Sequence, residues 1–292
     1  MKIVLLSTIG PNFKIDRVVS EAKALGHVCS HVSIGDIDLQ IKDNQLVLPG
    51  ITDIDSDTDV VIFHSIFSSV KNTISLVRHF RKKGIKVFDN NYGQIYYSIN
   101  KVADLTKLSL ENFPLPDSFH TRSYNDFPSL CAKIGYPIII KPIKTGKGRG
   151  IEKLEDPKQL SEFIKKANDE ERSAGYYLIQ EFIPYEKDLR VLIIGDHVYA
   201  MRRTPRPGDF RANFSLGGTV EIITPDEETK ELAKRALHCI GLSIGGVDVL
   251  ITPEGKRYIL EVNHNPGIEG IESATDENIA RTYLEHAISS AK

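Results

Sequence analysis

Two short apolar runs near the C-terminus carry the residues best suited to chemistry. Residues 246–252 and Arg257–Asn263 flank the turn-forming sequence Pro253-Glu-Gly-Lys. They therefore predict a β-hairpin with a loop at 253–256 and with Thr252 opposite Arg257. From this register each later pair can be counted, and polar side chains can be assigned to one face or the other.

Counting inward places Asp248 opposite Glu261, with Asn263 on the same face as Glu261. Carboxylates directly opposite each other repel, and the flanking residues are too apolar for a simple solvated face. A cation between the acids would resolve the repulsion, and an all-oxygen set of ligands suits Mg²⁺ or Mn²⁺. The alternative is an edge hairpin with exposed acids whose register differs by one residue. We favour the metal site.

A metal of this kind usually shares its coordination sphere with phosphate, and basic residues that suit phosphate occur in two stretches. Lys141 ends an apolar strand, where a buried ammonium needs a counter-charge. The glycine-rich loop 144–150 can wrap backbone amides around an anion, although it does not match the P-loop pattern. Arginine forks suit phosphate or carboxylate oxygens, but each basic residue taken singly is more typical of a surface charge than of a ligand. The second stretch, 201–213, contains Arg203, Arg211 and Asn213.

The segment Gln180-Glu-Phe-Ile-Pro, with Asp188 shortly after it, is typical of a strand that leads into a connector. Backbone groups of such a connector could hold the edge of an adenine. Glu181 or Asp188 could bind ribose hydroxyls or face a lysine. Core packing explains Phe182 and Ile183 equally well, and the two roles are compatible.

Composition and motifs exclude several classes of protein. With 292 residues, 41% of them hydrophobic and 26% charged, the chain is that of a folded globular protein of two or three units. Its formal net charge of −2 gives no general reason to bind nucleic acid. It contains no GxSxG motif, no CxxC pair and no apolar run long enough to cross a bilayer. We expect a cytoplasmic protein with reduced thiols and without a nucleic-acid or membrane partner.

The elements that must position these residues divide near residue 100. Residues 1–99 alternate strand and helix patterns, which predicts a small α/β domain with a largely parallel sheet. The turn after the first strand lacks GxGxxG, so a dinucleotide site is not expected there. The predicted strands are 2–7, 27–34, 59–63 and 85–89, and the predicted helices are 16–25 and 70–83.

Residues 100–292 mix helices with strands joined by tight turns, which predicts an α+β unit. His264 falls on the opposite face of its strand from Asn263, so we expect it to be structural. Besides the hairpin, the predicted strands are 136–142, 177–184, 189–194 and 197–203, and the predicted helices are 102–112, 157–171, 227–240 and 278–290.

From about residue 100 to its C-terminus the chain resembles the ATP-grasp superfamily and, within it, the RimK-type α-L-glutamate ligases. The order and spacing of the motifs carry the resemblance. They are Lys101; Gly135-Tyr-Pro-Ile-Ile-Ile-Lys-Pro; Gln180-Glu-Phe-Ile; Asp188-Leu-Arg-Val-Leu-Ile-Ile-Gly-Asp; Gly208-Asp-Phe-Arg-Ala-Asn; Gly217-Gly; Gly246-Val-Asp-Val; and Glu261-Val-Asn-His-Asn-Pro-Gly-Ile-Glu-Gly-Ile-Glu.

The resemblance implies an ATP-grasp fold, in which two α+β lobes clasp ATP. Residues 1–99 would form the small, Rossmann-like parallel-sheet domain that precedes it. Residues 100–183 would form the first lobe with a glycine-rich lid, and residues 184–292 the C-terminal, metal-binding lobe. Self-association as dimers or tetramers is also implied.

The resemblance further implies a role for each site residue. The phosphates of ATP would contact Lys101 and Lys141, and the adenine would lie against Gln180, Glu181, Phe182 and Ile183. The ribose would contact Asp188, and two Mg²⁺ or Mn²⁺ ions would be held by Asp248, Glu261 and Asn263. The transferred phosphoryl group would be flanked by Arg211 and Asn213, with Lys141, Arg203 and Arg211 as the catalytic residues.

The implied activity is ATP-dependent formation of an amide through an acyl phosphate. L-Glutamate, or another amino acid, would be joined to the terminal carboxylate of a protein, a polyglutamate chain or a small cofactor. Two departures leave a ribosomal acceptor open: the stretch between Glu181 and Asp188 is short, and Arg202-Arg-Thr-Pro-Arg-Pro carries two prolines. The alternatives are a ligase of a different amine, like those of lysine or glutathione biosynthesis, and a non-catalytic ATP-binding protein.

Overall fold

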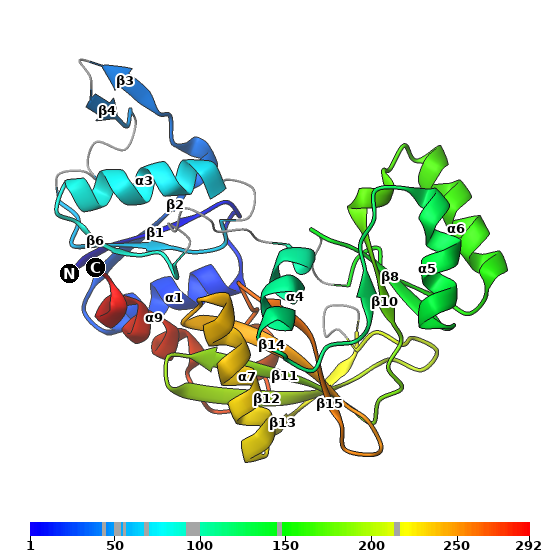
Figure 1. The fold of residues 1–292 in the computed structure, drawn as a ribbon. Coiled ribbons are helices and arrows are strands. Elements are labelled where there is room, and N and C mark those ends of the chain that lie inside the picture. The colour runs from blue at the N-terminus through cyan, green and yellow to red at the C-terminus, as the bar shows by residue number, and fades with distance from the viewer. Residues whose placement is uncertain are drawn as a thin grey trace.

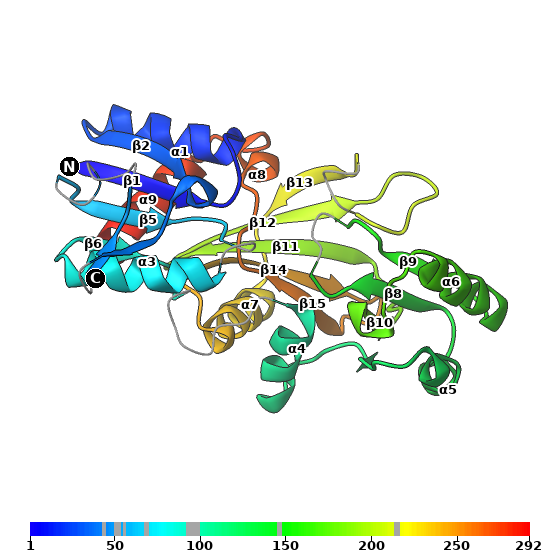
Figure 2. The same ribbon diagram turned by 90° about the horizontal axis from the view of Figure 1, so that it is seen from above.

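The computed structural model describes residues 1–42, 45–49, 54, 57–66, 70–91, 100–144, 148–212 and 217–292. An N-terminal domain, a first lobe and a C-terminal lobe surround a common centre, with the C-terminal lobe joining the other two (Figure 1). The view from above shows the same order of parts (Figure 2). The predicted ATP-grasp architecture with a preceding parallel sheet is confirmed.

The N-terminal domain is a parallel sheet with helices on both faces. Apolar residues bury both sides of the central strands, as expected of a parallel sheet. One face carries α1 and the C-terminal helix α9, and the other carries α3 (Figure 2). The strand order is β2 (Val28–Ser33), β1 (Lys2–Ser7), β5 (Val60–Phe63) and β6 (Lys86–Phe88), with α1 at Phe13–Ala24, α3 at Val70–Lys82 and a separate hairpin of β3 (Gln40–Lys42) and β4 (Gln45–Val47).

Helix α9 (Ile279–Ser290) belongs by packing to the N-terminal domain, although the sequence places it in the C-terminal lobe. Its Tyr283 and Leu284 are buried in one cluster with Ile15 of α1. The amide of Val87 donates to the carbonyl of Lys292 at 2.9 Å, and the reciprocal bond is 3.1 Å. The two ends of the chain therefore close a single core.

The first lobe is an antiparallel sheet with its own apolar core. Two helices, α5 (Phe127–Ile134) and α6 (Pro157–Asp169), supply Phe127, Leu160 and Phe163 to that core. The strand order is β7 (Ser118–Phe119), β10 (Tyr177–Glu181), β8 (Ile138–Pro142) and β9 (Glu152–Leu154).

The C-terminal lobe is a five-stranded antiparallel sheet. Helix α4 (Lys101–Leu110), assigned to the first lobe by sequence, packs instead against α7 and β15, because Leu105 and Leu108 are buried on that side. The strand order is β13 (Thr219–Ile223), β12 (His197–Thr204), β11 (Lys187–Ile194), β14 (Ile244–Ile251) and β15 (Arg257–Asn263), with α7 at Glu227–Ile240 and α8 at Glu269–Glu272.

The register of the β14–β15 hairpin differs from the prediction next to the turn and agrees with it at Asp248. Arg257 pairs with Ile251, so the predicted pairing with Thr252 is wrong. The amide of Thr252 donates to the carbonyl of Lys256 at 2.9 Å, so Thr252 lies opposite Lys256 and the loop is one residue shorter than predicted. A β-bulge then shifts the register, so that Asp248 lies opposite Glu261 as predicted.

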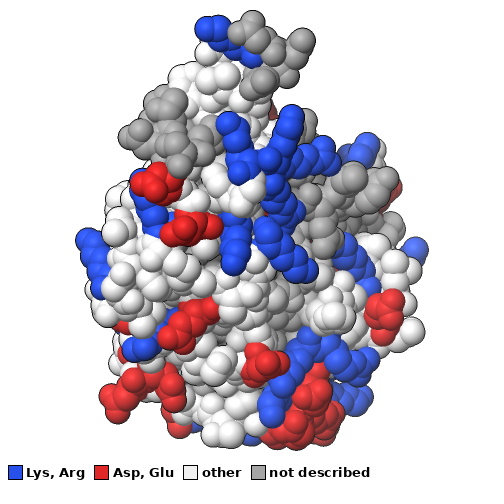
Figure 3. Space-filling model, turned by 90° about the vertical axis from the view of Figure 1, so that its left-hand side faces the viewer, with Lys and Arg blue, Asp and Glu red and all other residues white. Residues whose placement is uncertain are grey.

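Basic side chains gather on the face of the N-terminal domain that Figure 3 shows. Lysines and arginines in the last turn of a helix interact favourably with its dipole, and Arg81 also lies 3.6 Å from Asp89. The exposed basic residues of α3 and the segment after it are Arg78, Arg81, Lys82, Lys83 and Lys86.

Among the described residues, no helix has the length and apolar character that crossing a membrane requires.

Candidate active site

A pocket between the first lobe and the C-terminal lobe brings together most of the residues singled out by sequence. Its wall takes side chains from α4, β8, β10, β11, β12, β14 and β15 and from the segments that follow β10 and β12. Asn263 is not among the lining residues, and Asn213 and residues 145–147 of the glycine-rich loop lie outside the described residues. The predicted residues that line the pocket are Lys101, Lys141, Gln180, Glu181, Phe182, Ile183, Asp188, Arg203, Arg211, Asp248 and Glu261.

Lys101 opens α4 and faces the β14–β15 hairpin. The side chain of Asn100 caps the helix by accepting from the amide of Ala103 at 2.9 Å. The Nζ atom of Lys101 lies 3.4 Å from Glu261 Oε2. Burial disfavours the charged form of Glu261, but the combined attraction of Lys101, Lys141 and Arg190 outweighs this and lowers the pKa of the carboxyl. Glu261 is therefore held ionised, as a metal ligand must be.

Lys141 on β8 is 5% exposed and is held by a neutral side chain. Its Nζ donates to Gln180 Oε1 at 2.7 Å, and Gln180 Nε2 donates to Ser118 Oγ at 2.9 Å. Burial lowers the pKa of Lys141 to about 8, against the attraction of Glu261. Gln180, expected beside adenine, thus orients the lysine. The counter-charge predicted for Lys141 is supplied at longer range by Glu261.

Arg203 lies between two buried carboxylates. Its Nε donates to Asp188 Oδ1 at 2.9 Å, its Nη2 contacts the same oxygen, and Nη2 lies 3.2 Å from Asp248 Oδ2. Burial raises the pKa of Asp188. Burial also opposes ionisation of Asp248, yet Arg190 and Arg203 lower the pKa of Asp248 to about 2. Among the described atoms, Arg203 Nη1 is buried without a hydrogen-bond partner. This N–H group is available to an anion in the pocket.

Arg190 is the main residue that sequence reasoning missed. Its Nε and Nη2 donate to Asp248 Oδ1 and Oδ2, both at 2.7 Å. It lies two residues after Asp188 on β11, directly opposite Asp248 on β14. The strand period of two puts Arg190 on the face of Asp188, so the alternation in Asp188-Leu-Arg was the signal that could have found it.

The hairpin fits a hard cation when phosphate completes the coordination. Within the described ranges no three His, Cys, Asp or Glu side chains cluster as a metal site, so Asp248 and Glu261 need other ligands. Asn263 lies opposite Gly246, one alternate pair along from Asp248 and Glu261. Its Nδ2 is buried without a partner among the described atoms, which leaves its amide uncommitted. A carboxylate oxygen has two lone pairs, so Asp248 keeps acceptor capacity beyond its arginines.

Arg211 joins the C-terminal lobe to the glycine-rich loop. Its Nη1 donates to the carbonyl of Gly148 at 3.3 Å, while Asp209 holds its Nε and Nη2 at 3.0 and 2.8 Å. The Nζ atom of Lys153 lies 4.1 Å from the ring centroid of Phe182, which also lines the pocket. Gly148 and Arg149 of the pocket belong to the glycine-rich loop singled out by sequence. The other lining residues, to which the sequence assigned no role, are Ile139, Ile151, Tyr185, Phe210, Ala212, Leu250 and Leu260.

His264 is not among the residues that line this pocket, in keeping with the structural role predicted from the sequence. Its Nε2 is 2.8 Å from Asp104 Oδ2, and both side chains are buried. The contact fixes α4, and with it Lys101, to the end of β15.

Comparisons with known proteins show the family of this chain. The model of the RimK-like ATP-grasp domain matches residues 98–287. A probable alpha-L-glutamate ligase of Coxiella burnetii is 31% identical over 301 aligned positions that span 100% of this chain and 97% of that protein. A protein of the same name from Shewanella pealeana is 35% identical over 215 residues, 72% of this chain but 46% of its own length. A third, from Pseudomonas putida, is 32% identical over 73% of this chain and 70% of its own length.

Solved structures share the fold at low identity. The ATP-grasp ligase PsnB, in complex with a phosphomimetic variant of its minimal precursor, Mg and ADP, superposes with a TM-score of 0.74 and 19% identity, over 98% of this chain and 97% of that chain. A RimK-domain ATP-grasp protein from Sphaerobacter thermophilus gives a TM-score of 0.69 and 18% identity, over 98% of this chain and 99% of that one.

Proposed function

Because this chain belongs to the RimK-like ATP-grasp family and is an ATP-grasp ligase, we propose that it joins the amino group of L-glutamate to the carboxylate of an acceptor. The observation that carries the proposal is the meeting of Lys101, Lys141, Arg203 and Arg211 with the acidic hairpin in one pocket. A site in which cations and carboxylates meet suits phosphoryl transfer. The full-length relative named a probable alpha-L-glutamate ligase supports glutamate as the amine.

The chemistry follows from the poor leaving group of a carboxylate. An acceptor oxygen attacks the γ-phosphorus of ATP, which forms an acyl phosphate and releases ADP. The neutral amine then attacks the acyl carbon, phosphate leaves with the electrons of the C–O bond, and the amine proton passes to phosphate or water. Catalysis therefore needs positioning and neutralisation of charge.

Each described group has a part in that sequence. Lys141, held by Gln180, and Lys101 would contact the phosphates, and the unpaired Nη1 of Arg203 would donate to the transferred group. Asp248, Glu261 and Asn263 would hold Mg²⁺ or Mn²⁺, which when bound neutralises charge on the phosphates. Arg211 would close the glycine-rich loop over the site through Gly148 and exclude water from the acyl phosphate.

The test is an assay with Mg-ATP and each of the twenty amino acids, in which ADP release and product mass are measured together. We expect glutamate-dependent ADP and masses that rise by glutamyl units. Glu261→Gln should abolish the signal, whereas Glu254→Gln, an exposed change in the loop of the same hairpin, should not. ADP release with a different amino acid would replace glutamate as the amine. ATP binding without any product, also in the presence of cell extract, would refute the ligase.

A further inference from the structure

Lys14 is a buried ammonium outside the nucleotide pocket that the proposed chemistry does not use. It is the second residue of α1 and is only 6% exposed. Its Nζ donates to Asn265 Oδ1 and to the carbonyl of Pro266, both at 3.2 Å, and lies 4.5 Å from the ring centroid of Tyr283. Both hydrogen-bond acceptors are neutral, so this charge is buried without being balanced.

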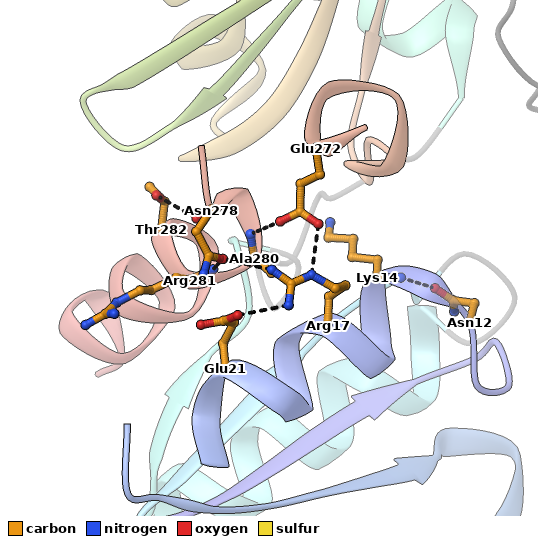
Figure 4. Close-up of polar contacts among 9 residues, drawn as sticks. All are labelled: Asn12, Lys14, Arg17, Glu21, Glu272, Asn278, Ala280, Arg281 and Thr282. Atoms are coloured by element: carbon orange, nitrogen blue, oxygen red, sulfur yellow. Dashed lines mark hydrogen bonds and ion pairs between the residues drawn. The ribbon is translucent and has the colours of Figure 1, made fainter. Parts of the chain in front are cut away.

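The carboxylates on neighbouring elements are committed elsewhere (Figure 4). Glu272 accepts from Arg17 Nε at 3.1 Å and from the amide of Ala280 at 2.9 Å, and Glu21 accepts from Arg17 Nη1 at 2.9 Å. In the described part of the chain no ion pair joins Lys14 to a carboxylate. Burial lowers the pKa of Lys14 to about 7. A buried charge of this kind is costly, and a ligand that completes it is a physical reason to keep it.

The place of Lys14 in the fold is one where ligands bind. The strand order β2-β1-β5-β6 puts β1 between the two halves of the sheet, and α1 starts at its carboxyl end. Open parallel sheets bind ligands outside the carboxyl ends of the strands at such a switch point. A lysine in the first turn of a helix is disfavoured by the helix dipole. The stability of α1 therefore does not explain Lys14.

His64, directly after β5, supplies a second donor at the same place. Its Nδ1 lies 3.2 Å from the hydroxyl of Tyr283, and its Nε2 is buried without a partner among the described atoms. Burial, with the charges of Lys14 and His31, holds the pKa of His64 well below its ordinary value, so the ring is neutral. If Nδ1 accepts from the hydroxyl, Nε2 carries the hydrogen and lacks an acceptor.

The segment that Lys14 holds continues directly from the metal-binding hairpin. Asn265 and Pro266 follow Asn263, and a Cβ atom built on Gly246 would lie 3.1 Å from Pro266 Cβ. The cations of the nucleotide pocket face ATP and the acid to be phosphorylated. A reaction between glutamate and an acidic acceptor brings further carboxylates, which need cations elsewhere.

We propose that Lys14 and His64 form a subsite for a substrate carboxylate, the one that is not phosphorylated, where the N-terminal domain meets segment 263–267. The carboxylate would replace Asn265 Oδ1 and the Pro266 carbonyl as the partner of Lys14 Nζ and would accept from His64 Nε2. It belongs either to the incoming amino acid or to the acceptor. The inference rests on the proposed ligase function, which supplies the acidic substrates.

The test compares Lys14→Met with Lys14→Arg and with Lys23→Met, an exposed change on the same helix. The probes are L-glutamate and the dipeptide glutamyl-glutamate as acceptor. Lys14→Met should raise the KM for one of them about 10- to 100-fold, as loss of a charged hydrogen bond does, and leave the KM for Mg-ATP and kcat within about twofold. Lys14→Arg should recover most of the affinity, and Lys23→Met should behave as wild type.

The probe whose KM moves identifies the source of the carboxylate. Unchanged KM values for both probes overturn the subsite. A joint change in the KM values for ATP and both probes and in kcat also overturns it, because Lys14 would then only hold segment 263–267 in place.

A measurement of probe binding tests the subsite independently of the proposed ligase reaction. If the wild type is inactive but either probe raises its Tm, and the effect is lost in Lys14→Met, the subsite stands and the ligase fails. If neither probe raises the wild-type Tm, the subsite is refuted.

If Lys14→Met does not fold, measurements on the wild type alone test the subsite. Calorimetry of probe binding at pH 8, in buffers of different ionisation enthalpy, should show uptake of about one proton per bound probe as Lys14 becomes charged. Binding without proton uptake counts against the subsite.

Discussion

Replacing Lys14 with methionine should change how the stability of the protein depends on pH. Burial lowers the pKa of Lys14 from 10.5 to about 7 in the folded chain. Between these two values the unfolded chain binds more protons than the folded one, so the free energy of unfolding rises with pH. Below pH 7 both states are protonated, and the full penalty of about 5 kcal/mol is present. Above pH 10.5 the penalty is gone.

The pH interval isolates the charge from the other effects of the substitution. Lys14→Met also leaves Asn265 Oδ1 and the Pro266 carbonyl without their donor, which costs about 1–3 kcal/mol each at every pH. That loss cancels in the comparison between two pH values. From pH 7 to pH 9 the wild type should gain about 2 kcal/mol relative to Lys14→Met.

Urea unfolding of both proteins at pH 7, 8 and 9, at constant ionic strength, measures this difference. Lys23→Met, whose lysine is exposed on the same helix, should show no such trend. A wild-type gain below about 0.5 kcal/mol would mean that Lys14 stays protonated and has a counter-charge, which refutes the reasoning. Saturating substrate should flatten the trend if its carboxylate pairs with Lys14.

Three further substitutions test other contacts. Lys141→Met should raise the KM for ATP about 10- to 100-fold in steady-state kinetics without unfolding the protein, because it removes a buried ammonium that in the proposed reaction contacts the phosphates. Arg190→Met should lower the free energy of unfolding by about 3 kcal/mol in urea, because it leaves buried Asp248 with one fewer partner. Gly245→Ala should cost about 1–3 kcal/mol in the same assay, because its Cβ would overlap the Leu237 side chain.

Matched controls accompany these substitutions. The control for Lys141→Met is Lys133→Met, an exposed change on the first lobe. The control for Gly245→Ala is Gly10→Ala, whose added Cβ would meet no atom within 4 Å. Arg202→Met breaks a surface pair with Glu221 and should cost less than about 1 kcal/mol. If Arg190→Met costs no more than Arg202→Met, Asp248 does not depend on Arg190. An unchanged KM for ATP in Lys141→Met would remove that lysine from the phosphate site.

The alternation of side chains along strands let the sequence determine the hairpin acids. Glu261 and Asn263 share a face whatever the rest of the fold does, and the count from the turn put Asp248 opposite Glu261. The pairing nearest the turn was wrong because the loop is tighter than expected. A bulge at Leu260 restores the pairing of Asp248 with Glu261, and nothing in the local sequence predicts this bulge. Periodicity thus predicted the face, while turn geometry and the bulge decided the register.

The pattern of apolar runs likewise determined the parallel sheet of the N-terminal domain and the elements that carry the pocket. Partners that lie far apart in sequence were decided only by the tertiary structure. Lys14 meets Asn265, 251 residues later, and Arg190 meets Asp248, 58 residues later. Such pairs form because packing fixes how α1, β11 and β14 lie against one another, and a local pattern contains no information about that packing. The sequence therefore predicted most of the charged residues that line the pocket, and the fold decided which charges they face.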